Sequence, residues 1–179
     1  MIPLALAAAL FLQQPAPQRP APAPANRDAA QATSRQAITD VGLRVAEVRS
    51  TYDLYRRAVF NLPDAMVLQR GQELRRVCGD LASMARAAGG RICRTCFAAG
   101  AQRAVERYRA VLPSVSQVGV RCAGQVAQPA GGREAARALR RSVDQVGRGL
   151  TNGLQTYEAR VQGIREGFGI APASGQPHR

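Results

Sequence analysis

The placement of the four cysteines constrains this chain more than any other feature. All of them lie within residues 78–122, as Cys78, a C-x-x-C pair formed by Cys93 and Cys96, and Cys122. In an exported protein, four cysteines imply two disulfides, and three pairings exist. Because helical patterns surround the cysteines, the stretch predicts a hairpin of two helices tied by disulfides.

The amino-terminal residues indicate export. Residues 2–12 form an uncharged apolar run that is too short to span a bilayer, which needs about 20 residues, but fits a secretory signal. The small residues at 23 and 25 suggest cleavage ahead of Asn26. Residues 13–25 contain five prolines and should form an extended linker. We therefore expect residues 1–25 to be a signal peptide and Pro/Ala-rich linker, and the protein to be periplasmic or extracellular.

Apolar residues at three- and four-residue spacing predict a helical domain over residues 26–170. A first helix is expected over residues 34–61, with a cap at Thr33 or Ser34 and Pro63 as its stop. A second is expected over residues 63–88, ended by two glycines.

The remaining chain predicts two more helices. A third is expected over residues 92–112, with Pro113 as its stop, and a fourth over residues 134–168. The residues between them lack a firm pattern and are expected to form a long loop tethered by Cys122. The tail, residues 171–179, is expected to be disordered.

Two long apolar stripes with two shorter helices between them predict an all-α fold, an antiparallel bundle of about four helices with a disulfide-tied central hairpin. The alternative is a long coiled-coil pair of the first and last helices, with the cysteine hairpin at one end. The stripes would also allow a homo-oligomer.

Hairpin geometry favours pairing Cys78 with Cys122 and Cys93 with Cys96. A hairpin about residues 89–91, followed by a reversal near residue 113, brings the two outer cysteines to one level. The chain-entropy contribution is about 4 kcal/mol for the long loop and about 2 kcal/mol for the short one. The crossed pairing, Cys78–Cys96 with Cys93–Cys122, stays open.

The sharper alternative is thiol–disulfide exchange at the C-x-x-C pair. If Cys93 opened a helix, the helix dipole together with Arg91 and Arg94 would favour its thiolate. Cys93 would then be the nucleophile and Cys96 the resolving thiol. The strand–helix alternation that surrounds a thioredoxin-like motif is absent from the sequence, so the structural role is favoured.

Other chemistry finds little support. A zinc site would need a second close pair of ligands, which Cys78 and Cys122 do not supply. Haem attachment fails because residue 97 is Phe, and His178 is the sole histidine. The acidic residues are dispersed, so no catalytic residue, metal site or cofactor is assigned. We expect a non-catalytic protein and identify no small-molecule substrate.

The balance of basic and acidic residues indicates what kind of partner the protein can bind. The chain has 25 basic and 12 acidic residues, a net charge of +13, and every basic residue is Arg. Such a charge keeps a protein soluble and favours anionic partners. Basic blocks and tryptophan are absent, so nucleic-acid binding is disfavoured. We expect a binding, structural or chaperone-like component of the cell envelope that meets an anionic envelope component or an acidic protein.

Overall fold

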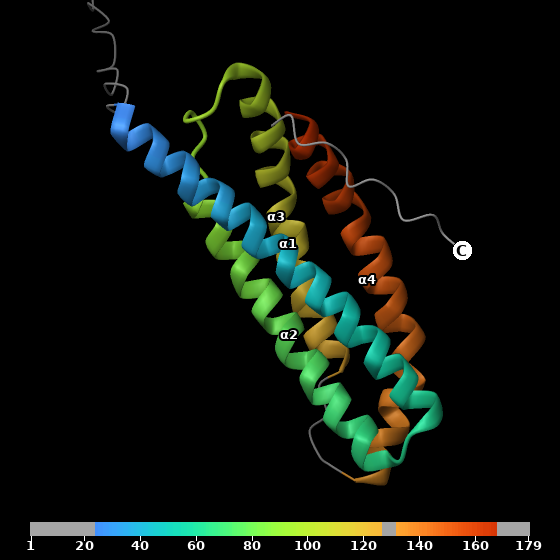
Figure 1. Cartoon of the computed structure of the whole chain (residues 1–179). Coiled ribbons are helices and arrows are strands. Elements are labelled where there is room, and N and C mark those ends of the chain that lie inside the picture. Colours follow the sequence, from blue (N-terminus) through green and yellow to red (C-terminus); the bar gives the residue numbers. More distant parts are fainter. Residues whose placement is uncertain (1–23, 127–131, 168–179) are drawn as a thin grey trace, which may run out of the picture.

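Four long helices form the part of the chain that the computed structural model describes, residues 24–126 and 132–167 (Figure 1). They are α1 (Pro24–Asn61), α2 (Asp64–Arg91), α3 (Ala99–Gln125) and α4 (Arg133–Gly167). Each helix runs antiparallel to the next, and the described residues include no strand. The predicted antiparallel helical bundle is therefore confirmed. The expected signal segment, nearly all of the linker and the tail lie outside the described residues.

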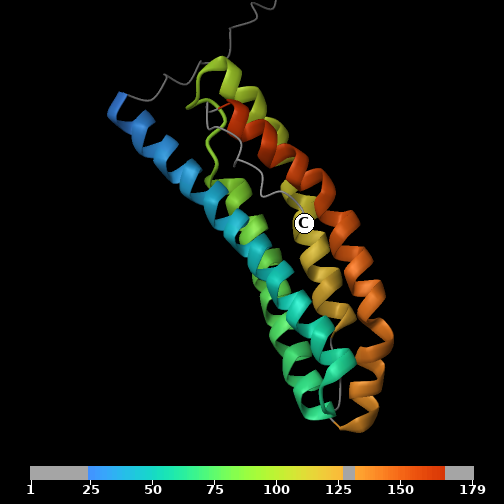
Figure 2. The ribbon, with the colours of Figure 1, turned by 45° about the vertical axis from the view of Figure 1, so that its right-hand side comes forward.

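The helices pack in chain order. α1 packs on α2, α2 on α3 and α3 on α4, whereas α1 and α4 make far fewer contacts. Figure 2 shows α1 diverging from α4 towards the amino-terminal end of α1. The alternative of a coiled coil between the first and last helices is therefore wrong.

α1 begins about ten residues before the expected start at residue 34. The apolar stripe does start after this residue, but the preceding residues 24–33 include four Ala, the residue that favours helix most. Thr33 and Ser34 lie inside the helix and do not cap it, because their hydroxyls donate to the carbonyls of Ala29 and Ala30. The second helix was expected over residues 63–88; it continues through the two glycines to Arg91.

The largest difference from the sequence prediction concerns α3. The third helix does not cover residues 92–112, because it begins at Ala99 and runs through Pro113 to Gln125. A proline inside a helix costs about 3 kcal/mol. The second half of α3 offsets this cost by burying an apolar face, whose members recur at three- and four-residue spacing: Leu112, Val115, Gly119, Cys122 and, just beyond the helix, Val126. The expected loop over residues 113–133 is therefore wrong, since most of it is helix.

The fourth helix, expected over residues 134–168, matches α4 closely.

Two tyrosines in the carboxy-terminal half of α1 bind the backbone of α4. The hydroxyl of Tyr55 is buried and donates to the carbonyl of Leu139 at 2.7 Å, and that of Tyr52 donates to the carbonyl of Val143 at 3.2 Å. Buried polar groups need such partners, so these bonds set the register of α1 on α4 there.

α2 and α3 approach closely where a disulfide joins them. Cys78 bonds to Cys122 with the Cα atoms 5.9 Å apart. Near this bond Ser116 donates to the carbonyl of Ala82, and Gly119 faces the α2 backbone directly. Small residues on α3 thus allow the two backbones to meet, and the disulfide secures a contact that is already tight.

This close approach predicts a large effect at Gly119. A Cβ atom there would lie 2.6 Å from the carbonyl oxygen of Cys78 and 2.8 Å from the amide nitrogen of Ala82. Both are backbone atoms that cannot turn away, so Gly119→Ala should lower the free energy of unfolding by about 1–3 kcal/mol. Denaturant titration with the disulfides intact measures this.

Gly124→Ala is the matched control on the same helix. No atom lies within 4 Å of a Cβ placed at Gly124. Its substitution should therefore raise the free energy of unfolding by up to about 1 kcal/mol, the ordinary preference of a helix for Ala. Equal effects of the two substitutions would contradict the close packing of α2 on α3.

Candidate functional site

The C-x-x-C pair lies in the segment that joins α2 to α3, residues 92–98, which we call the cysteine turn. Cys93 is bonded to Cys96, with Cα atoms 5.8 Å apart. Both disulfides thus have the connectivity that hairpin geometry favoured. Ile92, Cys96 and Phe97 are buried, whereas Cys93 is half-buried. The turn therefore packs into the bundle, with Cys93 the less buried of its two cysteines.

The cysteine turn is held on the amino-terminal half of α1. Arg27 and Gln31 both donate to the carbonyl of Cys96, Arg27 at 2.9 Å. The backbone N–H of Cys93 donates to the hydroxyl of Ser34 at 2.9 Å. These bonds place α1 against the turn and explain why the helix extends so far before its apolar stripe.

The position of Cys93 corrects the redox hypothesis in one respect. Cys93 was expected to open a helix, but the next helix begins six residues later, at Ala99. The favourable effect of a helix amino terminus falls off within a turn, so it does not act on Cys93. Arg91 forms an ion pair with Asp40 at 3.6 Å, which leaves Arg94 as the nearby arginine without an assigned acidic partner. The electrostatic support for a Cys93 thiolate is therefore weaker than the sequence indicated.

A small basic recess of about 500 Å³ lies between α2 and α3, next to the cysteine turn. Arg86, Arg94 and Arg109 line it, and Glu106 is the one carboxylate among its lining residues. Arg109 donates twice to the carbonyl of Gly89, at 2.8 and 3.3 Å. Burial and, after it, the neighbouring charge of Arg94 lower the pKa of Arg109. The recess adds local positive charge beside the turn.

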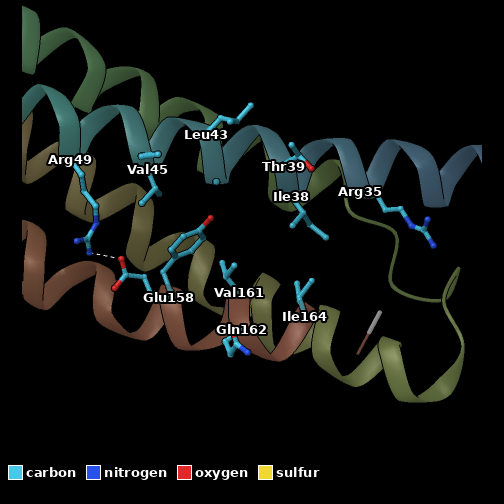
Figure 3. Close-up of a pocket in the computed structure, with 13 residues that line it drawn as sticks. Arg35, Ile38, Thr39, Leu43, Val45, Arg49, Glu158, Val161, Gln162 and Ile164 are labelled. Carbon is cyan, nitrogen blue, oxygen red and sulfur yellow. Dashed lines mark ion pairs between the residues drawn. The ribbon is translucent and has the colours of Figure 1, made fainter. Parts of the chain in front are cut away.

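The larger concavity is a groove of about 800 Å³ between α1 and α4 (Figure 3). Ile38 and Val45 of α1 and Val161 and Ile164 of α4 point into it from opposite sides. They belong to the apolar stripes of the two helices, which in a closed bundle would interdigitate. We call this concavity the α1–α4 groove.

Two contacts link the walls of the groove. An ion pair joins Arg49 of α1 to Glu158 of α4 across it. Gly42 faces Tyr157, whose hydroxyl would lie 3.7 Å from a Cβ atom at that position. α1 diverges from α4 towards the amino-terminal end of α1, so the groove opens towards the end that carries the cysteine turn (Figure 2).

The separation of α1 from α4 follows from what α1 rests on. Over its amino-terminal half α1 is bonded to the cysteine turn through Arg27, Gln31 and Ser34. A helix held there cannot also close onto the carboxy-terminal half of α4. The disulfide turn thus acts as a spacer that keeps the α1–α4 groove open.

The sequence identified the cysteines but missed the groove. The spacing of the apolar stripes predicts bundle core, which is right for the buried Val45 and Ile164, whereas Ile38 and Val161 are only half-buried at the groove. Nothing in that spacing tells whether two stripes meet. The contacts of Arg27, Gln31 and Ser34 decide it, and their partners are the backbone carbonyl of Cys96 and the backbone N–H of Cys93, which leave no sequence signal.

The described residues show no other centre of chemistry. They contain no group of three or more His, Cys, Asp or Glu side chains placed to hold a metal ion. Within the same ranges, no helix has both the length and the apolar composition needed to cross a bilayer. Comparison with models of protein families, with curated proteins and with solved structures finds no match for this chain.

The spacer role of the cysteine turn predicts a local effect of breaking its bond. In the variant with both Cys93→Ser and Cys96→Ser, the turn should loosen and release the amino-terminal half of α1. The cost should be about 2 kcal/mol, and hydrogen exchange should accelerate over residues 28–40 more than over the rest of α1. Hydrogen-exchange mass spectrometry measures this.

The other disulfide supplies the comparison. Replacing Cys78 and Cys122 with Ser removes a bond between the middle of α2 and the last turn of α3, and the cost should be about 4 kcal/mol. Protection should then fall across all four helices. A uniform loss of protection in the Cys93/Cys96 variant too would contradict the spacer role.

Proposed function

We propose that the protein is an exported, non-catalytic binding component of the cell envelope, whose α1–α4 groove receives an amphipathic helical segment of an acidic partner protein. The observation that carries the proposal is the groove itself, which the half-buried Ile38 of α1 and Val161 of α4 line from opposite sides. Apolar surface in a concave site is the usual basis for accepting a partner segment.

The dimensions of the groove suit a helix. Its lining on α1 runs from Arg35 to Arg49, which corresponds to about 21 Å of helix or roughly four turns. A partner helix of that length could place apolar residues at i, i+3, i+4 and i+7 against both walls. The partner would complete the packing that α1 and α4 do not provide for each other.

The acidic character of the partner is argued from charge. The chain carries a net charge of +13, and Arg35 and Arg49 lie along the α1 side of the groove. The one carboxylate that lines the groove, Glu158, pairs with Arg49, so the lining as a whole carries one positive charge in excess. Complementary charge speeds encounter and disfavours basic partners.

Export is supported by the disulfides and by the extent of α1. Both pairs of cysteines are bonded, and such bonds persist in oxidising compartments. Cleavage ahead of Asn26 would retain Arg27 and Gln31, which bind the cysteine turn. Amino-terminal sequencing of the protein from its native host should find Asn26 first, and an intact leader would contradict export.

The groove proposal predicts selective binding of an acidic amphipathic peptide. The probe is a labelled peptide of five turns with Leu on one face and Glu on the other, compared with a Leu/Lys peptide of equal length. We expect the Leu/Glu peptide to bind, and the variant Ile38→Asn/Val161→Asn to bind it at least about tenfold more weakly, because the two half-buried walls lose apolar contact. Fluorescence anisotropy measures both affinities.

Leu54→Asn is the matched control for this experiment. Leu54 lies on α1, is 42% exposed and does not line the groove. Its substitution should leave the affinity unchanged. Equal binding of both peptides, or an equal loss of affinity in the Leu54 variant, would overturn the groove proposal.

The competing candidate is thiol–disulfide exchange through Cys93 and Cys96. It is favoured by the half-buried state of Cys93 beside the buried Cys96 and by the neighbouring arginines. A reduction potential between about −120 and −270 mV, with Cys93 selectively alkylated near neutral pH, would support exchange. A potential below about −300 mV would mark the bond as structural.

A further inference from the structure

The end of the bundle opposite the cysteine turn exposes an apolar cluster at the α1–α2 connection. Phe60 is 65% exposed, Leu62 40% and Met66 37%. They lie within seven consecutive residues and make up half of the large apolar side chains that are exposed in the described part of the chain. We call these three residues the apolar tip. Exposed apolar side chains that gather in one place mark interaction surfaces more often than scattered ones do.

The connection that carries the apolar tip is held by Arg140 of α4. Its guanidinium donates to the carbonyl of Val59 at 3.1 Å and to that of Leu62 at 3.2 Å. It also donates to the carboxylate of Asp64 at 2.6 Å. Three bonds from one side chain fix the turn, so its apolar side chains are exposed in a defined arrangement and not because the turn is unpacked.

Basic residues predominate in the two segments that form this end of the bundle. Residues 56–66 and 133–141 contain six arginines, Arg56, Arg57, Arg133, Arg137, Arg140 and Arg141, against two carboxylates, Asp64 and Glu134. Asp64 is already paired with Arg140. The next carboxylates, Asp53 and Asp144, follow about one helical turn farther along α1 and α4. The start of α4 lies beside the α1–α2 connection at the lower end of the bundle in Figure 1.

We propose that this end of the bundle docks on an anionic lipid bilayer, with Phe60, Leu62 and Met66 entering the interface and the surrounding arginines contacting lipid phosphates. Aromatic and aliphatic side chains beside basic ones are the composition of interfacial anchors. Acidic lipids attract basic residues within about a Debye length. The proposal goes beyond the groove and does not depend on it, since the groove opens towards the other end.

The absence of tryptophan from the chain makes a direct test available. Phe60→Trp places a single tryptophan in the tip. Its emission should shift to shorter wavelength, and brominated lipid should quench it, when the full-length protein meets vesicles of equimolar phosphatidylglycerol and phosphatidylcholine at low salt. Val120→Trp is the control, because Val120 is 56% exposed on α3 and lies outside the tip. Equal responses of the two variants, or no response at position 60, would overturn the proposal.

Two further pairs of variants separate the apolar and the electrostatic contributions. Phe60→Ser/Leu62→Ser should lower the partition coefficient onto these vesicles by at least about tenfold, measured by cosedimentation, whereas Val120→Ser should not. Because these side chains are exposed, circular dichroism should show an unchanged fold.

For the charges, the variant Arg56→Gln/Arg57→Gln is compared with Arg103→Gln/Arg107→Gln. Both remove two exposed arginines, so the net charge is the same in the two variants. The first should lose at least about tenfold in partitioning and the second much less. Equal losses would show attraction by net charge alone and overturn the docking geometry. Binding of the wild-type protein to polyphosphate but not to the vesicles would overturn it in favour of a soluble polyanion.

Discussion

The bundle depends on a competition for the amino-terminal half of α1. That half can rest on α4, as a closed four-helix bundle requires, or on the turn between α2 and α3. It rests on the turn, because hydrogen bonds join Arg27, Gln31 and Ser34 to the backbone of Cys93 and Cys96. A short disulfide loop is compact enough to pack against a helix and still present its backbone groups. The openness of the α1–α4 groove follows from this one arrangement.

The sequence predicted the architecture better than the element boundaries, for reasons that particular residues make plain. Apolar periodicity located α1, α2 and α4 because nothing interrupts their stripes. At Pro113 the local rule for proline was weighted above the spacing of Leu112, Val115, Gly119 and Cys122, which continues through it. Burial along a full helix exceeds the loss of one backbone bond. Had the stripe been followed across the proline, α3 would have been placed within a few residues of its true end.

The candidate site was less accessible to sequence reasoning. The cysteines were identified and the favoured pairing is right, but the reversal near residue 113 on which it rested is wrong, because α3 runs through Pro113 and brings Cys122 opposite Cys78 directly. The position of Cys93 relative to the next helix was predicted wrongly, because the start of α3 was placed seven residues too early. The groove could not be found at all, since Ile38 and Val161 have the same spacing whether or not they meet a partner helix. The exposure of Phe60, Leu62 and Met66 at the apolar tip could not be predicted from the sequence either. An apolar residue is recognised as exposed only once the burial of its neighbours is known.

The glycines of α4 have a consequence for how the groove can change. Tyr52 of α1 fits against Gly147, and Val118 of α3 fits against Gly153, so no Cβ atom can be accommodated at either position without movement. Two recesses filled from two different helices prevent α4 from sliding or turning about its axis. A single residue inserted between Gly153 and Tyr157 would leave these recesses occupied and rotate the rest of α4 by about 100°. The carboxy-terminal wall of the groove would then face elsewhere, and the buried Tyr157 and Ile164 would leave the core with it, so the groove cannot be altered by such an insertion without a cost to the bundle.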